Sequence, residues 1–241
     1  MRAELKMLID ILQQPEKFQW SSPIAHLIER NPDYSAWGDS SLYAAGGFST
    51  DLKFWWQINW PKEIQDRNIT TIKIRTPETG ETISINALEY ATLIINYEAA
   101  TQTINEISDP SAPEYPVLLN WTDNSAALAW TKKMCKSSNA GKALSRILCG
   151  QMINNRLGLN AAHIAGKDNI IADRISRVHT NNSNPDFNLL LQEFPQLRCC
   201  RRYHPSAKLV STICEAMSSA LGVDPTKQLP KGLFEAAKVT S

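Results

Sequence analysis

The chain has 241 residues, 43% of them hydrophobic and 20% charged, so it can bury a core and is not wholly disordered. With 25 Lys and Arg against 24 Asp and Glu, its net charge of +1 excludes a globally basic nucleic-acid coat. No apolar run reaches the roughly 18 residues of a membrane span, and the N-terminal segment lacks a signal-peptide pattern, so we expect neither a membrane segment nor export. The five cysteines are odd in number and irregularly spaced, which favours reduced thiols in an intracellular protein, cytoplasmic or nuclear.

The first predicted elements are helical pieces in residues 1–30, followed by strands. Three strands separated by turn-prone residues are expected at Tyr34–Gly38, Ala44–Ser49 and Phe54–Trp60. The adjacent glycines Gly46 and Gly47 in the second strand predict a close backbone approach or a bulge. A small inserted hairpin is predicted around the sequence PETG, with its strands at Thr71–Arg75 and Glu81–Ile85.

Helices and strands alternate in the rest of the chain. A long helical pattern covers Asn86–Ile104, and two further strands are predicted at Val117–Trp121 and Leu159–Ile164. Other helices are predicted at residues 124–133, 141–156, 168–177 and 207–221. Three antiparallel strands followed by this alternation predict an α/β fold, with a five-stranded mixed sheet flanked by helices.

This pattern divides the chain into three parts. Residues 33–178 hold all five strands and are expected to form the domain. Residues 1–32 are interpreted as an N-terminal helical arm or linker, and residues 179–241 as a C-terminal tail with a short helix.

Positive charge is concentrated in one stretch. Residues 124–167 contain no Asp or Glu and seven basic residues, which are Lys132, Lys133, Lys136, Lys142, Arg146, Arg156 and Lys167. In a neutral protein such a stretch predicts one positive face, with an ordinary solvated helix face as the alternative.

Four acidic residues stand where apolar patterns end or are interrupted. Asp39 and Asp123 follow the first and fourth strands, Glu89 lies one turn into the long helix, and Asp173 lies in the last helix of the domain. A buried carboxylate is costly unless it is compensated, and a divalent cation such as Mg²⁺ would compensate several at once. Each acid has an ordinary alternative role: a turn for Asp39, a helix cap for Asp123, the helix dipole for Glu89, and for Asp173 an ion pair with Arg174, Arg177 or a neighbouring lysine.

Four segments of the chain stand out together, namely GDSSLYAAGGFS, NALEY, TDNSAALAW and HIAGKDNIIADRISR. They resemble the ribonuclease H domain of retroelement polyproteins. The last segment is the most specific, because His163, Gly166, Asn169 and Asp173 have the spacing of that family. The resemblance covers residues 33–177.

The resemblance implies a ribonuclease H-like fold and an endonuclease that hydrolyses the RNA strand of RNA–DNA hybrids, as part of a retroelement reverse transcriptase. It implies that Asp39, Glu89, Asp123 and Asp173 bind two Mg²⁺ ions, with Mn²⁺ as the alternative, and that Asp39 bridges both. Two such ions can activate a water and stabilise the leaving oxygen of an in-line displacement. His163 corresponds to the mobile-loop histidine of the family, which helps proton transfer or product release.

Polar residues near the acids are candidates for substrate binding. Asn86, Asn124 and Ser125 could recognise the 2′-hydroxyl groups of RNA, and helix capping is their alternative role. The lysines expected to face the phosphates of the DNA strand are Lys132, Lys133, Lys136 and Lys142.

Two other groups of residues have the composition of a binding site. Trp55, Trp56 and Trp60 could stack on bases, but Trp56 and Trp60 share one strand face, which favours a place in the core. Cys199 and Cys200, with a histidine four residues further on, lack the spacing of a zinc site.

The chain has no polymerase signature of the Tyr-x-Asp-Asp type, so a reverse-transcriptase polymerase domain either is a partner on another part of a longer polyprotein or has been lost. Two other functions stay open: a catalytically silent ribonuclease H-like module that binds nucleic acid, and a DNA-cutting nuclease or transposase on the same fold. The latter enzymes usually place a Glu in the last helix, where this chain has Asp173. A decayed fragment without a selected function is a third interpretation.

Overall fold

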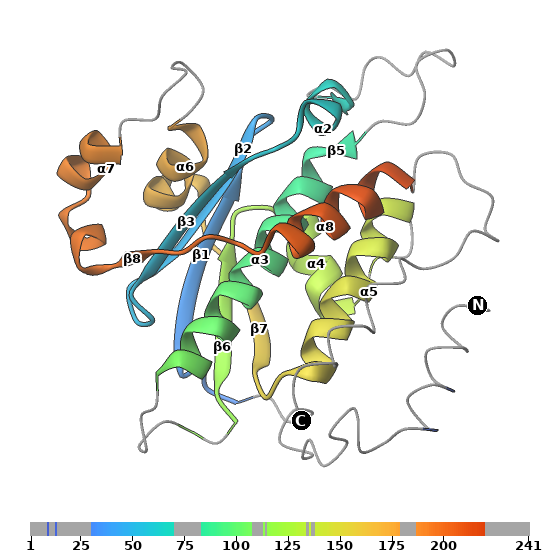
Figure 1. Ribbon diagram of the computed structural model, residues 1–241, viewed down its shortest axis with the longest axis horizontal. Helices are drawn as coiled ribbons and strands as arrows, with labels where there is room; N and C mark the ends of the chain where they lie inside the picture. The colour runs from blue at the N-terminus through green and yellow to red at the C-terminus, as the bar shows by residue number, and fades with distance from the viewer. Residues whose placement is uncertain are drawn as a thin grey trace.

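The structure, a computed structural model, describes residues 30–69, 83–107, 115–133, 138–178 and 187–219, with single positions at 9, 13, 113 and 135. Most of the predicted N-terminal arm, most of the inserted hairpin, and Lys136 lie outside the described residues. The described segments form a central sheet with helices on both faces (Figure 1).

A mixed six-stranded sheet forms the centre of the fold. Its strands in spatial order are β7 (Gly158–His163), β6 (Val117–Thr122), β1 (Tyr34–Ser40), β2 (Ala44–Ser49), β3 (Phe54–Asn59) and β8 (Arg201–Arg202). The strands β1, β2 and β3 are antiparallel neighbours, while β6 runs parallel to β1 and β7 runs parallel to β6. The predicted α/β fold is therefore confirmed, and its arrangement is compatible with a ribonuclease H-like fold.

The sheet has one strand more than the five predicted. The additional strand β8 pairs in parallel with the outer edge of β3, through Phe54 with Arg201 and Trp55 with Arg202. A strand of two residues has no alternating pattern, so nothing in the sequence distinguishes it from a loop. A separate two-stranded sheet joins β4 (Asn68–Ile69) to β5 (Ile83–Ser84) across the inserted segment.

Helices cover both faces of the sheet. The long helix α3 (Ile85–Glu106) packs with α5 (Asn139–Asn154) and α8 (Ala207–Ser219) on one face, while α6 (Ile170–Arg177) lies on the other (Figure 1). Shorter helices complete the fold: α2 (Lys62–Asp66), α4 (Ser125–Lys133), α7 (Phe187–Glu193), and 3₁₀ turns at Gly166–Asp168 and Pro195–Cys199. Among the described helices, none is both long and apolar enough to span a membrane.

A buried polar network fixes α3 against the sheet. Trp56 Nε1 donates to Asn96 Oδ1 at 2.8 Å, and Asn96 Nδ2 donates to Asn120 Oδ1 at 2.9 Å. Asn120 Nδ2 in turn donates to the Leu93 carbonyl at 3.0 Å, so strands β3 and β6 are both tied to the same helix. Trp56 and Trp60 are fully buried, which confirms their predicted place in the core.

The glycine pair of β2 lets helices approach both faces of the sheet closely. A Cβ on Gly47 would overlap Asn96 of α3, and a Cβ on Gly46 would overlap Ile175 of α6 and lie 3.0 Å from the Ser176 backbone nitrogen. Successive residues of a strand point to opposite faces, so each glycine serves one helix. The predicted close backbone approach is confirmed.

The face under α6 has an apolar cluster of its own, and part of the predicted tail belongs to it. Trp37 and Phe48 stack with ring centroids 5.1 Å apart, beside the buried Ile175. The guanidinium of Arg202 lies 4.0 Å from the ring centroid of Phe187. The tail also contributes the buried residues Leu190, Leu197 and Cys200. The division of the chain at residue 178 stays a prediction, but the described part of the tail packs on the sheet.

Replacing Gly46 with alanine should lower the free energy of unfolding by about 2–3 kcal/mol, because the added methyl group forces α6 away from β2. Urea unfolding monitored by circular dichroism measures this change. Gly158→Ala is the matched control, since its Cβ would meet Val117 at 3.2 Å, and it should change stability by less than about 1 kcal/mol. Equal effects of the two substitutions would contradict the close approach of α6.

Candidate metal centre

Three carboxylates from different elements meet at one edge of the sheet. Asp39 is the penultimate residue of β1, Asp123 comes directly after β6, and Glu89 lies in the second turn of α3. Because β1 and β6 are parallel neighbours, the residues at their carboxyl ends share this edge. Carboxylate oxygens of the three residues lie within 4.8 Å of one another. Asp39 thus belongs to the strand that it was expected to follow.

The environment of these carboxylates opposes their ionisation. Asp39 and Glu89 are each 4% exposed, and Asp123 is half-buried. Burial raises the pKa of Asp39 to about 6, although a hydrogen bond from Ser176 lowers it. Burial, followed by the charge of Asp39, raises the pKa of Glu89 well above its usual value, and burial raises the pKa of Asp123 as well. Three like charges in this space are therefore unfavourable without a compensating cation.

One oxygen of Glu89 has no hydrogen-bond donor. The Ser40 backbone nitrogen donates to Oε1 of Glu89 at 3.1 Å, whereas Oε2 is buried with no partner among the described residues. Carboxylate oxygens are the ligands that Mg²⁺ and related hard cations prefer. Gly166 leaves room beside the site, because a Cβ there would lie 2.9 Å from Asp123 Oδ2. The three carboxylates therefore suit a divalent cation, and these residues could hold one.

Asp173, the fourth predicted ligand, lies outside this group of three. Its Oδ1 accepts a hydrogen bond from Arg177 Nε at 2.6 Å, one turn further along α6. The charge of Asp173 still raises the pKa of Asp39, of Glu89 and of Asp123, so its carboxylate is near the cluster. The ion pair with a neighbouring arginine, which the sequence offered as the alternative role of Asp173, is the arrangement observed.

Helix α6 also contacts the cluster directly. Ser176 Oγ is buried and donates to Asp39 Oδ2 at 2.6 Å. The sequence offered Arg177 as a possible ion-pair partner of Asp173 but gave no role to Ser176, although both stand in the segment that carries the family spacing. Their positions three and four residues after Asp173 place them on the same helix face, and this spacing was the available signal.

His163 and Asn169 lie where the chain passes from β7 into α6. His163 is the exposed last residue of β7, and its Nε2 lies 3.2 Å from the Asp123 carbonyl oxygen. Asn169 is buried, and its Nδ2 donates to the Gly38 carbonyl at 3.0 Å, which ties the start of α6 to β1. The spacing of this segment thus places His163 beside the backbone of Asp123 and Asn169 as a link between α6 and β1.

The three polar candidates for substrate binding form one group next to Asp123. Asn124 Nδ2 donates to Asn86 Oδ1 at 2.9 Å, while Asn124 Oδ1 accepts from the backbone nitrogens of Ala126 and Ala127. Ser125, the first residue of α4, is exposed. Helix capping, the alternative role, is therefore observed for Asn124.

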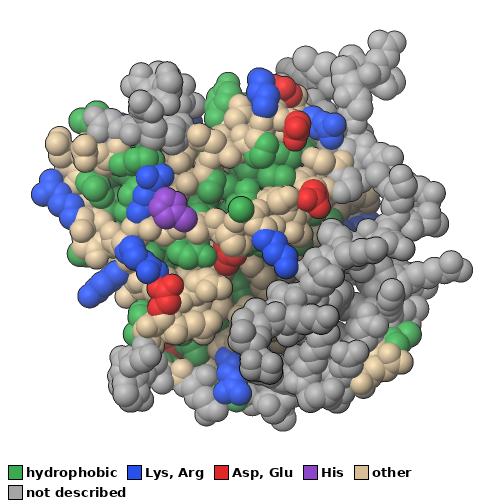
Figure 2. All heavy atoms as spheres, viewed as in Figure 1, with side chains coloured by type: hydrophobic (Ala, Val, Ile, Leu, Met, Phe, Trp, Pro, Cys, Tyr) green, Lys and Arg blue, Asp and Glu red, His purple; other side chains and the backbone are tan. Residues whose placement is uncertain are grey.

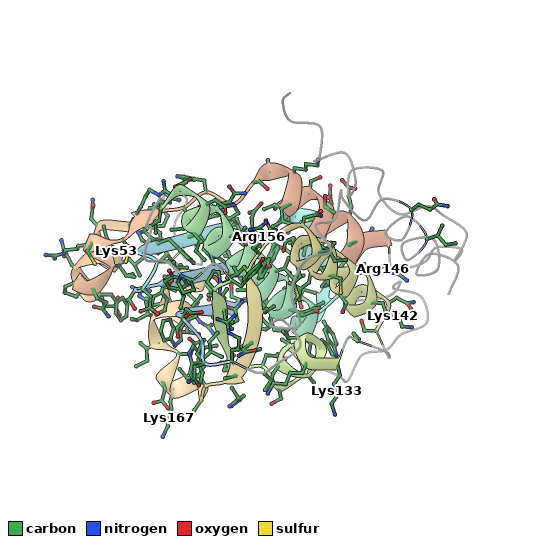
Figure 3. The ribbon with its side chains drawn as sticks, turned by 90° about the horizontal axis from the view of Figure 1, so that it is seen from below. Lys53, Lys133, Lys142, Arg146, Arg156 and Lys167 are labelled. Atoms are coloured by element: carbon green, nitrogen blue, oxygen red, sulfur yellow. The ribbon has the colours of Figure 1, made fainter. Side chains whose placement is uncertain are left out.

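The predicted phosphate-binding lysines lie on α4 and α5. Lys132 and Lys133 are exposed in the last turn of α4, and Lys142 is half-exposed on α5. Figure 3 shows Lys133 and Lys142 at one end of the molecule, next to Arg146, with Lys53 at the other end. On the face seen in Figure 2, positive and negative side chains are interspersed. The lysines on α4 and α5 are therefore a local group rather than a coat.

Comparison with protein families, with curated proteins and with solved structures gave no match for this chain. The chain is therefore described by its fold and its site alone. The fold is a mixed sheet between helices, and the site is a carboxylate cluster at the ends of two parallel strands. Within the described residues, Asp39, Glu89 and Asp123 form the one group of metal-ligand type, and Cys199 and Cys200 are free thiols outside it.

The pKa of Asp39 predicts how stability depends on pH and on a cation. The carboxyl group of Asp39 binds its proton more tightly in the folded protein than in the unfolded chain. Protonation of Asp39 therefore stabilises the fold fully below the usual pKa of 3.8, and this stabilisation is lost as the pH rises through about 6. In the presence of a chelator, the melting temperature should fall between about pH 5 and about pH 8. At the higher pH, Asp39→Asn should stabilise the protein by about 1–3 kcal/mol.

Millimolar Mg²⁺ should raise the melting temperature of the unmodified protein near neutral pH and have a smaller effect on Asp39→Asn, because a ligand of the cation has been lost. Asp66→Asn is the control, since Asp66 is exposed and pairs with Lys62 away from the cluster. Differential scanning calorimetry measures both effects. Equal Mg²⁺ responses in the two variants would argue against a cation at this cluster.

Proposed function

We propose that this chain is a metal-dependent endonuclease that hydrolyses the RNA strand of RNA–DNA hybrids, as the ribonuclease H domain of a retroelement reverse transcriptase. The observation that carries the proposal is the convergence of Asp39, Glu89 and Asp123, with one buried Glu89 oxygen lacking a donor. The resemblance of residues 33–177 to this family and the compatible sheet topology support the same function. A polymerase domain elsewhere in a polyprotein would be its partner.

In this proposal Asp39, Glu89 and Asp123 would hold Mg²⁺, or Mn²⁺ as the alternative, and Asp173 would serve as a further ligand of a second ion. When bound, two such ions supply Lewis acidity and charge neutralisation for phosphodiester hydrolysis. Attack of water on phosphorus would break the bond to the 3′ oxygen and leave a 5′-phosphate and a 3′-hydroxyl.

The chain's own residues have two roles around the phosphate. Ser176 holds Asp39 in place through its short hydrogen bond, and Asn169 holds the start of α6 against β1. The exposed imidazole of His163 lies beside Asp123, from where it could transfer a proton to or from the reacting groups. The carboxylates are thus positioned by buried contacts, whereas the proton-transfer group is open to solvent.

Substrate recognition would use polar and basic groups on α3, on the turn after β6, and on α4 and α5. The bonded pair Asn86 and Asn124, with the exposed Ser125, offers short polar groups that could reach 2′-hydroxyls across a shallow minor groove. Lys132, Lys133 and Lys142 would contact phosphates, which position a duplex without reading its sequence.

The function is tested by incubating the protein with a labelled RNA strand paired to DNA, in Mg²⁺, in Mn²⁺ or in a chelator. Cleavage of the RNA strand alone is expected, with a requirement for the cation. Asp123→Asn should lower the rate by at least about 100-fold, because it removes a ligand charge without changing the shape of the side chain. Duplex DNA and duplex RNA are the substrate controls.

Two outcomes would favour the other functions that the sequence left open, and a third would assign the activity elsewhere. Binding of the hybrid without cleavage by folded protein would favour a silent binding module. Cleavage of duplex DNA would favour a DNA nuclease or transposase. Cleavage of the hybrid at the same rate by Asp123→Asn would show that another site, or a contaminant, is responsible.

Charge removal on α5 should weaken hybrid binding. Lys142→Gln should lower the affinity by a few-fold and reduce the slope of log affinity against log salt by about one unit, as expected for one lost phosphate contact. Lys53→Gln is the control, because Lys53 lies at the other end of the molecule (Figure 3). Fluorescence anisotropy at several salt concentrations, in a chelator to prevent cleavage, measures both variants. Identical slopes would exclude Lys142 from the interface.

A further inference from the structure

A positive side chain already stands at the carboxylate cluster. Arg177 donates from Nε to Asp173 Oδ1 at 2.6 Å. Its charge also acts on other members of the cluster, since it lowers the pKa of both Asp39 and Asp123, and their charges together with that of Asp173 raise the pKa of Arg177. Arg177 is therefore a counter-ion of the cluster as well as a partner of one residue.

The position of Arg177 is fixed by the packing of α6. Gly46 lets this helix lie directly on β2, and Ile175 is buried against the sheet. Ser176, the next residue, donates to Asp39, so the helix cannot rotate without breaking that bond. The side chains of Arg177 and Asp173 lie toward solvent from this contact and are 55% and 42% exposed, respectively. The guanidinium therefore occupies one oxygen of a carboxylate that is open to solvent.

We propose that Arg177 is a built-in competitor for the divalent cation at Asp173, an inference that rests on the proposed metal centre. One cation binds where Asp39, Glu89 and Asp123 converge, and there the unpaired Glu89 oxygen gains a partner. A second cation needs Asp173 and must displace the guanidinium from it. The two binding steps consequently differ in affinity, and Arg177 weakens the second step.

The neighbouring arginine provides a matched control. Arg174 lies on the same helix, is exposed to a similar degree, and donates from Nε to Glu193 Oε2 at 2.8 Å. Glu193 is on α7 and is not a member of the cluster. Arg174→Gln and Arg177→Gln therefore remove the same charge and the same kind of ion pair from one helix, and only the second change frees a carboxylate of the proposed centre.

The experiment counts bound Mn²⁺ by electron paramagnetic resonance and measures binding heats by calorimetry, on the full chain without nucleic acid. Arg177→Gln should tighten the weaker step by about three- to fivefold, the size expected for a half-exposed ion pair, while Arg174→Gln should leave both steps unchanged. In the background of Asp173→Asn, the Arg177 substitution should have no such effect. Circular dichroism in a chelator checks that each variant is folded, and Arg177→Lys replaces Arg177→Gln if the latter does not fold; the weaker lysine pair should also tighten the step.

The other possible results would contradict either the competition by Arg177 or the metal centre itself. If the unmodified protein binds Mn²⁺ and Arg177→Gln binds it with the same affinities, or more weakly, then Arg177 does not compete with the cation for Asp173. The proposed metal centre would still stand. If Arg174→Gln tightens binding equally, the effect is one of net charge rather than of the Asp173 pair, which also overturns the inference. If the unmodified protein binds no Mn²⁺, the proposed metal centre itself fails.

Discussion

The burial of three carboxylates at the ends of β1 and β6 is the constraint on which the site depends. Parallel pairing of these strands brings Asp39 and Asp123 to one edge, and α3 adds Glu89 from above the sheet. Like charges so close together repel and lose hydration, so the surrounding structure must hold them by other contacts. The network from Trp56 through Asn96 to Asn120 does this for α3, because it links the helix to two strands.

The opposite face of the sheet completes the arrangement through α6. Its close approach over Gly46 lets Ser176 reach Asp39 and sets Asp173 and Arg177 at the rim of the cluster. Two helices on opposite faces thus contribute to a single site at the sheet edge. Glu89, on α3, is almost fully buried and lacks a donor for one oxygen, whereas Asp173, on α6, is half-exposed and paired. The site thus has a buried part that could hold a cation and an outer carboxylate that is paired with an arginine.

The sequence predicted the elements well where hydrophobic periodicity was strong. The five predicted strands of the central sheet and the long helix are found within two residues of their predicted bounds, since each has a pattern fixed by burial. The carboxylates could be found because they interrupt or end such patterns. The pairing of Asp173 with Arg177 could not be chosen over metal binding, because residues four apart on a helix can always meet and the sequence does not say which partner is closer. The strand β8 and the packing of the tail depend on contacts between distant segments, which leave no local pattern.

The tail illustrates how such contacts become visible only in three dimensions. Glu98 stands in the middle of the long helix, where burial raises its pKa, and both of its carboxylate oxygens accept from Ser206 at the start of α8. Ser206 Oγ also accepts from the Leu209 backbone nitrogen at 3.2 Å, so it caps α8 while it anchors that helix to α3. In sequence, Glu98 has the same appearance as Glu89, an acid within an apolar helix. The difference is the partner: the chain itself supplies donors to both oxygens of Glu98 and leaves one oxygen of Glu89 without any. That contrast within one helix distinguishes Glu89 as a residue that could hold a cation.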